Sequence, residues 1–310
     1  MNLQEETRRG YTIPAQMKEV WAIQLEIAKH LLNVCKRHGL RIWADGGTLL
    51  GAVREHGYIP WDDDMDFLMP RKDYDRLVAI SEEEFKAPYH FQCLGKEKDY
   101  IRGHAQIRYD GTTAIRYAEV WMPYHQGIFI DLFVYDSIPN DDTEEWRNSL
   151  KRADYIEHIL WTSLFHNGSI FSPKTYITWI SSNIYCLFKG KKNLMEEYQN
   201  LFRKYDVPEN KRVAPPCFDR TIFKTATKQK EWYRETLYMP FEDISVPVHT
   251  GYDMVLKTQY GDDYMTPAQV SNMHGTLEVL DAKTDYKEYI PVLRRQRLTD
   301  KLTGKNKGKR

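Results

Sequence analysis

The amino-acid sequence predicts an α+β fold, in which a mixed sheet is flanked by helices and joined to a mainly helical insertion or second subdomain. Three observations support this prediction. Two β-prone segments at 64–68 and 128–134 carry acidic residues, an amphipathic helical pattern precedes them, and helical patterns dominate 144–192. We therefore expect a catalytic core, a helical region, a C-terminal part of the core domain and a basic disordered tail, over 1–143, 144–235, 236–298 and 299–310.

The first long helix is expected over 15–38. Apolar residues recur there at helical spacing, Pro14 stands just before the start, and Gly39 is suited to the position after the last turn. A strand is expected over 40–44. The turn after it leads directly into a short helix over 48–54, whose N–H groups would point back at the turn.

Two later segments carry acidic residues in β-prone surroundings. The segment 64–68 alternates polar and apolar residues, which would place Asp64 and Asp66 on one face, about 7 Å apart along the strand. The run 128–134 is strongly β-prone and carries Asp131 as its one charge. A carboxylate inside such a strand needs a partner, so we expect all three aspartates to share one site.

Composition and charge exclude several classes of protein. The chain has 44 acidic and 44 basic residues, so no overall field favours nucleic acid as a partner. Its four cysteines form no CxxC pair, which is typical of free thiols in a reducing compartment. The sequence starts without a signal-peptide pattern, and no apolar run has the roughly 20 residues that span a membrane. We expect a cytoplasmic protein.

The most informative feature is the turn Asp45-Gly46-Gly47-Thr48, followed by the acidic cluster Asp62-Asp63-Asp64-Met65-Asp66. Four carboxylates between apolar flanks repel one another, so the cluster must either stay in water or be neutralised by a cation. An EF-hand calcium loop would need glycine at Phe67 and glutamate at Asp73, so the cluster is not such a loop. A metal-binding DxD of glycosyltransferase type would fit the cluster, and so would a solvated acidic loop.

The nucleotidyltransferase pattern accounts for more of the sequence. It combines a Gly-Gly-Thr turn, a DxD on a strand and a third carboxylate on a later strand. Gly46-Gly47-Thr48, Asp64 with Asp66, and Asp131 occur in this order. Carboxylates and phosphates are the ligands that Mg²⁺ prefers, and glycines leave room for a phosphate. Arg54 is a candidate phosphate ligand, unless it forms a structural salt bridge instead.

The sequence resembles the LicD family of phosphocholine transferases, whose distant animal relatives are the fukutin-related proteins. The resemblance is carried by the runs 44–54, 57–66 and 69–74, by Arg108 in a middle motif, and by 126–133. Weaker similarity continues to 240–265, where the C-terminal signature departs from the family pattern around Asp262 and Asp263.

This resemblance implies a nucleotidyltransferase-like fold that uses Mg²⁺ or Mn²⁺ to transfer phosphocholine from CDP-choline to a hydroxyl of a cell-surface glycan, releasing CMP. The acceptor would be of the lipopolysaccharide, teichoic acid or capsule type. Transfer of another alcohol phosphate from its CDP-activated form stays open, as does an inactive glycan- or nucleotide-binding protein. Asp131 would complete the site or act as general base. The metal ligands would be Asp62, Asp64, Asp66 and Asp131, and the substrate-binding residues Gly46, Gly47, Thr48, Arg54 and Arg108.

Two further expectations concern the substrate and the membrane. A quaternary ammonium is held by aromatic faces, so we expect a choline cage among residues near the motif strands. The segment 169–188 is rich in apolar residues and ends in Lys189-Gly190-Lys191-Lys192; it is either a core helix or a surface-seeking helix that meets a membrane or a lipid-linked acceptor. The cage candidates are Tyr58, Trp61, Tyr117, Trp121 and Tyr124.

Overall fold

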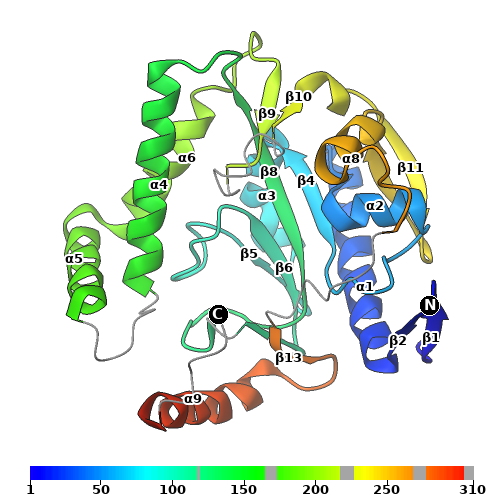
Figure 1. The fold of residues 1–310 in the computed structure, drawn as a ribbon, viewed down its shortest axis with the longest axis horizontal. Coiled ribbons are helices and arrows are strands. Elements are labelled where there is room, and N and C mark those ends of the chain that lie inside the picture. The colour runs from blue at the N-terminus through cyan, green and yellow to red at the C-terminus, as the bar shows by residue number, and fades with distance from the viewer. Residues whose placement is uncertain (117–118, 165–172, 217–226, 268–276, 304–310) are drawn as a thin grey trace.

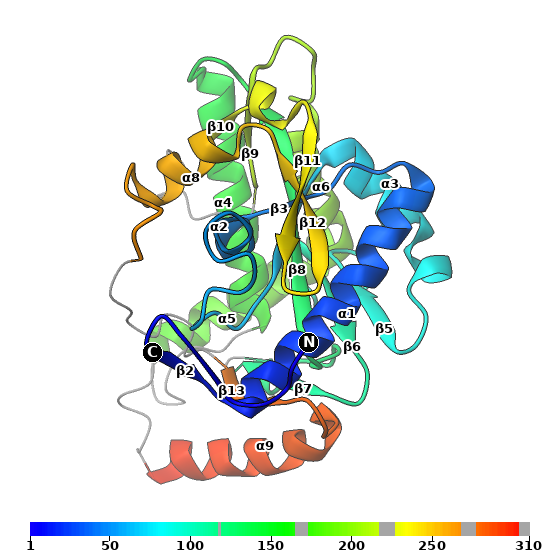
Figure 2. The same ribbon diagram turned by 90° about the vertical axis from the view of Figure 1, so that its right-hand side faces the viewer.

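The structure of the chain is a computed structural model, and it describes residues 1–116, 119–164, 173–216, 227–267 and 277–303. A mixed sheet lies at the centre, with α4, α5 and α6 on one side and α1, α2 and α8 on the other (Figures 1 and 2). Helix α9 lies across one end of the molecule. The α+β class expected from the sequence is therefore confirmed.

The central sheet has the order β10-β9-β8-β4-β3, and β6 pairs with β8 and with β5. Strands β4 and β8 run parallel, whereas the other pairs are antiparallel. The first half of β8 pairs with β6 and its second half with β9, on the edge opposite β4. The strands are β3 Trp43–Ala44, β4 Asp66–Pro70, β5 Tyr89–Gln92, β6 Ala105–Tyr109, β8 Phe129–Ile138, β9 Arg212–Ala214 and β10 Lys228–Gln229.

Three small antiparallel pairs surround this sheet. The pair β1–β2 precedes the first helix, β11–β12 forms a hairpin beside α1, and β13 returns from the C-terminal part to pair with β7 (Figure 2). Their bounds are β1 Glu6–Arg8, β2 Tyr11–Ile13, β7 Thr113–Arg116, β11 Thr236–Phe241, β12 Ile244–His249 and β13 Leu277–Asp281.

The helices next to the sheet enclose the main core. Trp21, Leu25, Trp43, Phe67 and Ile130 are buried in one cluster that joins α1 to strands β3, β4 and β8. The bounds are α1 Ala15–His38, α2 Gly46–Arg54, α3 Arg71–Glu84, the 3₁₀ turn η3 Lys230–Tyr233, α8 Tyr252–Tyr260 and α9 Tyr286–Thr303.

The helical region has a core of its own. It comprises α4 Glu144–Leu164, α5 Pro173–Lys189 and α6 Lys191–Arg203. Trp146 and Phe202 are buried there together with Ile138, the last residue of β8. Among the residues described, no helix combines the length and apolar character needed to cross a membrane.

The predicted first helix is confirmed over Ala15–His38. Gly39 ends it in a left-handed conformation, with φ of 60°, and its N–H donates to the Lys36 carbonyl. The strand expected over 40–44 is shorter, because only Trp43 and Ala44 pair with β4. The expected disordered tail is wrong at its start, because α9 continues to Thr303. Residues 304–310 lie outside the described ranges.

Candidate metal and phosphotransfer site

Two neighbouring parallel strands bring the predicted carboxylates together. In β4 and β8, Asp66 stands in register with Asp131. Asp64 precedes β4 rather than lying within it, so the predicted shared strand face is wrong in detail. Met65, between Asp64 and Asp66, is held by β8, because the Asp131 N–H donates to the Met65 carbonyl over 2.9 Å. One ligand oxygen from each of Asp64, Asp66 and Asp131 still lies within 4.8 Å of the others.

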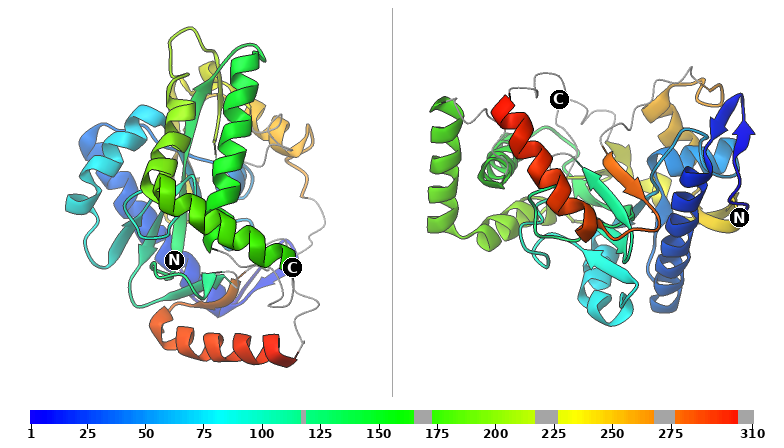
Figure 3. Two further views of the ribbon diagram at one scale, coloured as in Figure 1. Left: turned by 90° about the vertical axis from the view of Figure 1, so that its left-hand side faces the viewer. Right: turned by 90° about the horizontal axis from the view of Figure 1, so that it is seen from below.

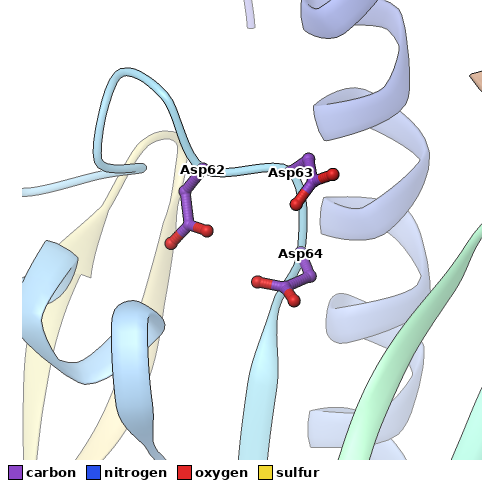
Figure 4. Close-up of side chains that lie close together, drawn as sticks. All are labelled: Asp62, Asp63 and Asp64. Atoms are coloured by element: carbon purple, nitrogen blue, oxygen red, sulfur yellow. The ribbon is translucent and has the colours of Figure 1, made fainter. Parts of the chain in front are cut away.

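A second carboxylate group adjoins the first. The oxygens of Asp62, Asp63 and Asp64 also lie within 4.8 Å of one another, so Asp64 belongs to both groups. Figure 4 shows these three side chains leaving the loop that leads into β4. Helix α1 fixes this loop, because Trp21 Nε1 donates to the Asp62 carbonyl over 2.9 Å and Gln24 Nε2 to the Asp63 carbonyl over 2.8 Å.

The electrostatics of the cluster fit a bound cation. Burial raises the pKa of Asp66 well above its usual range, and the charges of Asp64, Asp131 and Asp62 raise it further. Burial and Asp64 likewise raise the pKa of Asp62. A divalent cation bound by these oxygens would lower the pKa of the aspartates again, because it stabilises their ionised form. The residues present therefore fit Mg²⁺ or Mn²⁺.

Asp131 differs because polar side chains hold it. Gln106 Nε2 donates to Asp131 Oδ1 over 2.6 Å, and His104 Nε2 lies 3.3 Å from the same oxygen. Burial alone would raise the pKa of Asp131, but His104, Arg116 and Gln106 together lower it below its usual range. Burial lowers the pKa of His104, although the neighbouring Asp131 carboxylate opposes this effect.

The glycine turn shapes the other side of the cluster. Gly46 has φ of 52°, and a Cβ there would lie 3.0 Å from Asp66 Oδ2. A Cβ at Gly47 would lie 2.4 Å from Asp62 Oδ2. Thr48 Oγ1 accepts the Asp66 N–H over 2.8 Å. The turn and the carboxylates therefore lie side by side, and phosphate binding by Gly46, Gly47 and Thr48 stays a prediction.

The two predicted arginines lie in other surroundings. Arg108 is buried, and its guanidinium donates to the carbonyl of Gly127 and to the side-chain oxygen of Gln106, over 2.8 and 2.6 Å. It therefore reaches Asp131 only through Gln106. Arg54 pairs with Glu55 at 2.7 Å and donates to the Tyr264 carbonyl, which are the contacts of a structural role. Phosphate binding by either residue stays a prediction.

The four described cage candidates each have a different aromatic or cationic neighbour. Tyr58 is buried and stacks on Trp21 with ring centroids 4.3 Å apart. Trp61 contacts Tyr11 edge to face, Trp121 lies under the Arg294 guanidinium, and Tyr124 contacts Tyr100 edge to face. Tyr117 lies outside the described residues. A cage built from these residues stays a prediction.

Sequence reasoning gave no role to three residues of the site, although Asp45 begins the Gly-Gly-Thr stretch. Asp45 is buried and its charge raises the pKa of Asp66. Gln106 and His104 come from β6 and the residue before it, and they reach Asp131 because β6 pairs antiparallel with β8, with Gln106 opposite Asp131. The sequence signal for Asp45 was its position directly before Gly46. The sequence signal for His104 and Gln106 was only that they lie close to Arg108 in the chain.

A cavity of about 90 Å³ opens beside His104, between the loop before β6 and helices α4 and α6. Its lining is partly apolar and partly charged. The lining includes Ile101, Arg102, His104, Glu157, Trp161 and Tyr198. The cavity is connected to Asp131 through His104, whose Nε2 lies 3.3 Å from Asp131 Oδ1.

Comparison with known proteins finds one matching family model and several similar proteins. Residues 39–175 match the family model described as LicD/FKTN/FKRP, nucleotidyltransferase domain. The lipopolysaccharide cholinephosphotransferase LicD of Haemophilus influenzae is 26% identical over 250 residues, covering 80% of this chain and 91% of that protein. The human ribitol 5-phosphate transferase FKRP is 46% identical over 135 residues, covering 44% of this chain and 25% of FKRP. The matched range contains all the carboxylates described above.

Proposed function

This chain belongs to the LicD family, and on that premise we propose that it transfers phosphocholine from CDP-choline to a hydroxyl of a cell-surface glycan, releasing CMP. The observation that carries the proposal is the convergence of Asp64, Asp66 and Asp131 within 4.8 Å. The Haemophilus relative is named for the same head group and for lipopolysaccharide.

The carboxylates have separate roles in this proposal. Asp64, Asp66 and Asp131 would hold Mg²⁺ or Mn²⁺, and Asp62 would support them or hold a second ion. When bound there, the ion would neutralise phosphate charge and stabilise the departing CMP. Asp131 serves better as a ligand than as the general base, because its lowered pKa makes it a weak proton acceptor. The acceptor oxygen forms a bond to phosphorus as the bond to CMP breaks, and the hydroxyl proton leaves to solvent.

Transfer of a polyol phosphate is the second candidate. Its support is the match to human FKRP, a ribitol 5-phosphate transferase, which extends over 135 residues. The cavity beside His104 would receive the head group or the acceptor in either case, since it adjoins the residue that contacts Asp131.

The test measures CMP release from CDP-choline, CDP-ethanolamine and CDP-ribitol, each with lipopolysaccharide or teichoic acid, with Mg²⁺ or with EDTA. We expect Mg²⁺-dependent release that D64N/D66N lowers by more than roughly 100-fold. D141N/D142N is the matched control, because it makes the same change at two exposed aspartates away from the site.

Each outcome separates the candidates. Release that D64N/D66N leaves unchanged contradicts the proposed mechanism. Turnover of CDP-ribitol alone favours the second candidate. Binding of Mn²⁺ and CDP-choline without turnover favours an inactive binding protein.

A further inference from the structure

Helix α5 exposes a continuous apolar face on the outside of the helical region. Its exposed fractions range from 38% at Ile180 to 86% at Phe188. The opposite side packs against α4 (Figure 3). There, Asn183 Nδ2 donates to the Ser163 carbonyl. We define the α5 face as Tyr176, Ile177, Ile180, Ile184, Leu187 and Phe188.

The spacing of these residues makes the face one stripe rather than scattered exposures. Ile177, Ile180, Ile184 and Leu187 follow steps of three or four, which place side chains above one another on a helix. Exposed apolar patches of this kind mark contact with another molecule or with a membrane. Of the two alternatives for the segment 169–188, the core helix is therefore wrong for this face, and residues 169–172 lie outside the described residues.

The charges around the α5 face identify its partner. Between residues 173 and 192 the chain has four lysines and no acidic residue. Lys191 pairs with Asp99 at 3.0 Å, whereas Lys174, Lys189 and Lys192 are exposed at the two ends of the stripe. An apolar stripe flanked by lysines complements anionic lipid headgroups above acyl chains.

A second copy of the chain fits this face poorly. If two α5 faces met in antiparallel fashion, Lys174 of one copy would approach Lys189 and Lys192 of the other. In parallel fashion, each lysine would approach its own counterpart. Either arrangement places like charges together, which opposes self-association.

We propose that the α5 face docks the protein on an anionic lipid bilayer. The helix lies in the plane of the interface, with Leu187 and Phe188 among the acyl chains and Lys174, Lys189 and Lys192 at the phosphates. This surface would hold the protein at the inner face of the cell membrane. The inference stands independently of the proposed reaction, because it uses none of the residues near Asp131.

The test is flotation of the full chain with phosphatidylcholine vesicles that contain, or lack, about a third phosphatidylglycerol. We expect binding to the anionic vesicles, lowered by on the order of tenfold for each apolar side chain lost in L187S/F188S. K189E/K192E should lower binding by at least about fivefold per lysine and weaken its dependence on salt.

Two matched controls isolate the α5 face. V292S/L298S removes two exposed apolar residues from α9, and K36E/K72E reverses two exposed lysines on α1 and α3; both should bind as the wild type does. Equal binding by the wild type and L187S/F188S overturns the proposal. The proposal is also overturned if the wild type does not bind anionic vesicles but sediments as a dimer, while L187S/F188S sediments as a monomer.

Discussion

At the scale of single residues, Gln106 is the group that fixes the Asp131 carboxylate. Its amide donates to Asp131 Oδ1 over 2.6 Å, and its carbonyl oxygen is held by Arg108 over the same distance. Q106L removes both hydrogen bonds. We expect Mn²⁺ binding and CMP release to weaken by roughly 10- to 100-fold, because partners of a ligand set its orientation.

A neighbouring glutamine provides the control for this prediction. Gln92 stands opposite Gln106 in β5, is equally buried, and has no hydrogen-bond partner for its amide within the described residues. Q92L should therefore leave Mn²⁺ binding, measured by titration calorimetry, as it is in the wild type. Equal losses in Q92L and Q106L would mean that the sheet itself, and not the Asp131 contact, is responsible.

At the scale of elements, the first turn of α2 packs directly against the carboxylates of the site. In G47A the new Cβ would lie 2.4 Å from Asp62 Oδ2, so this carboxylate must turn away. We expect CMP release to fall by on the order of tenfold to 100-fold, with little change in the melting temperature.

The same substitution one turn later has a different consequence. In G51A the Cβ would lie 2.4 Å from the backbone oxygen of Gly57, which cannot rotate away. This variant should lose about 1–3 kcal/mol of unfolding free energy. Thermal unfolding and CMP release are measured on both variants. A lower stability of G47A than of G51A would contradict the separate roles of Gly47 in the site and Gly51 in packing.

The elements also show what the sequence could reveal. The bounds of α1 followed from Pro14 and Gly39, which act locally on the chain. Asp64 and Asp131 stood out because carboxylates are rare in apolar surroundings. Gln106 did not stand out, because its role depends on the pairing of β6 with β8. Such long-range register is set by packing of the whole sheet rather than by local pattern.

At the scale of the whole molecule, a buried histidine makes stability depend on pH. Burial lowers the pKa of His249 to about 4, from 6.5 in an unfolded chain. Between these values the unfolded state binds more protons than the folded state, so the unfolding free energy falls as the pH falls. The loss begins below about pH 6.5, reaches about 2 kcal/mol near pH 5, and levels off below about pH 4.

Urea unfolding at pH 7 and pH 5 checks this prediction. H249F should lose less stability than the wild type between the two pH values. Burial lowers the pKa of His125 to about 4 as well, so part of the dependence should remain in H249F. Identical losses in both proteins would show that His249 does not contribute.

Strand β8 has a consequence for how the chain would respond to being cut. In its first half, Ile130 and Leu132 on either side of Asp131 belong to the main core, and its last residue, Ile138, belongs to the core of α4 and α6. Strand β9 follows the helical region in the chain and returns to pair with Ser137 and its neighbours. A protease that nicked the loop at 139–143 would therefore leave two fragments interlocked through one shared strand, and the helical region would stay attached to the catalytic sheet.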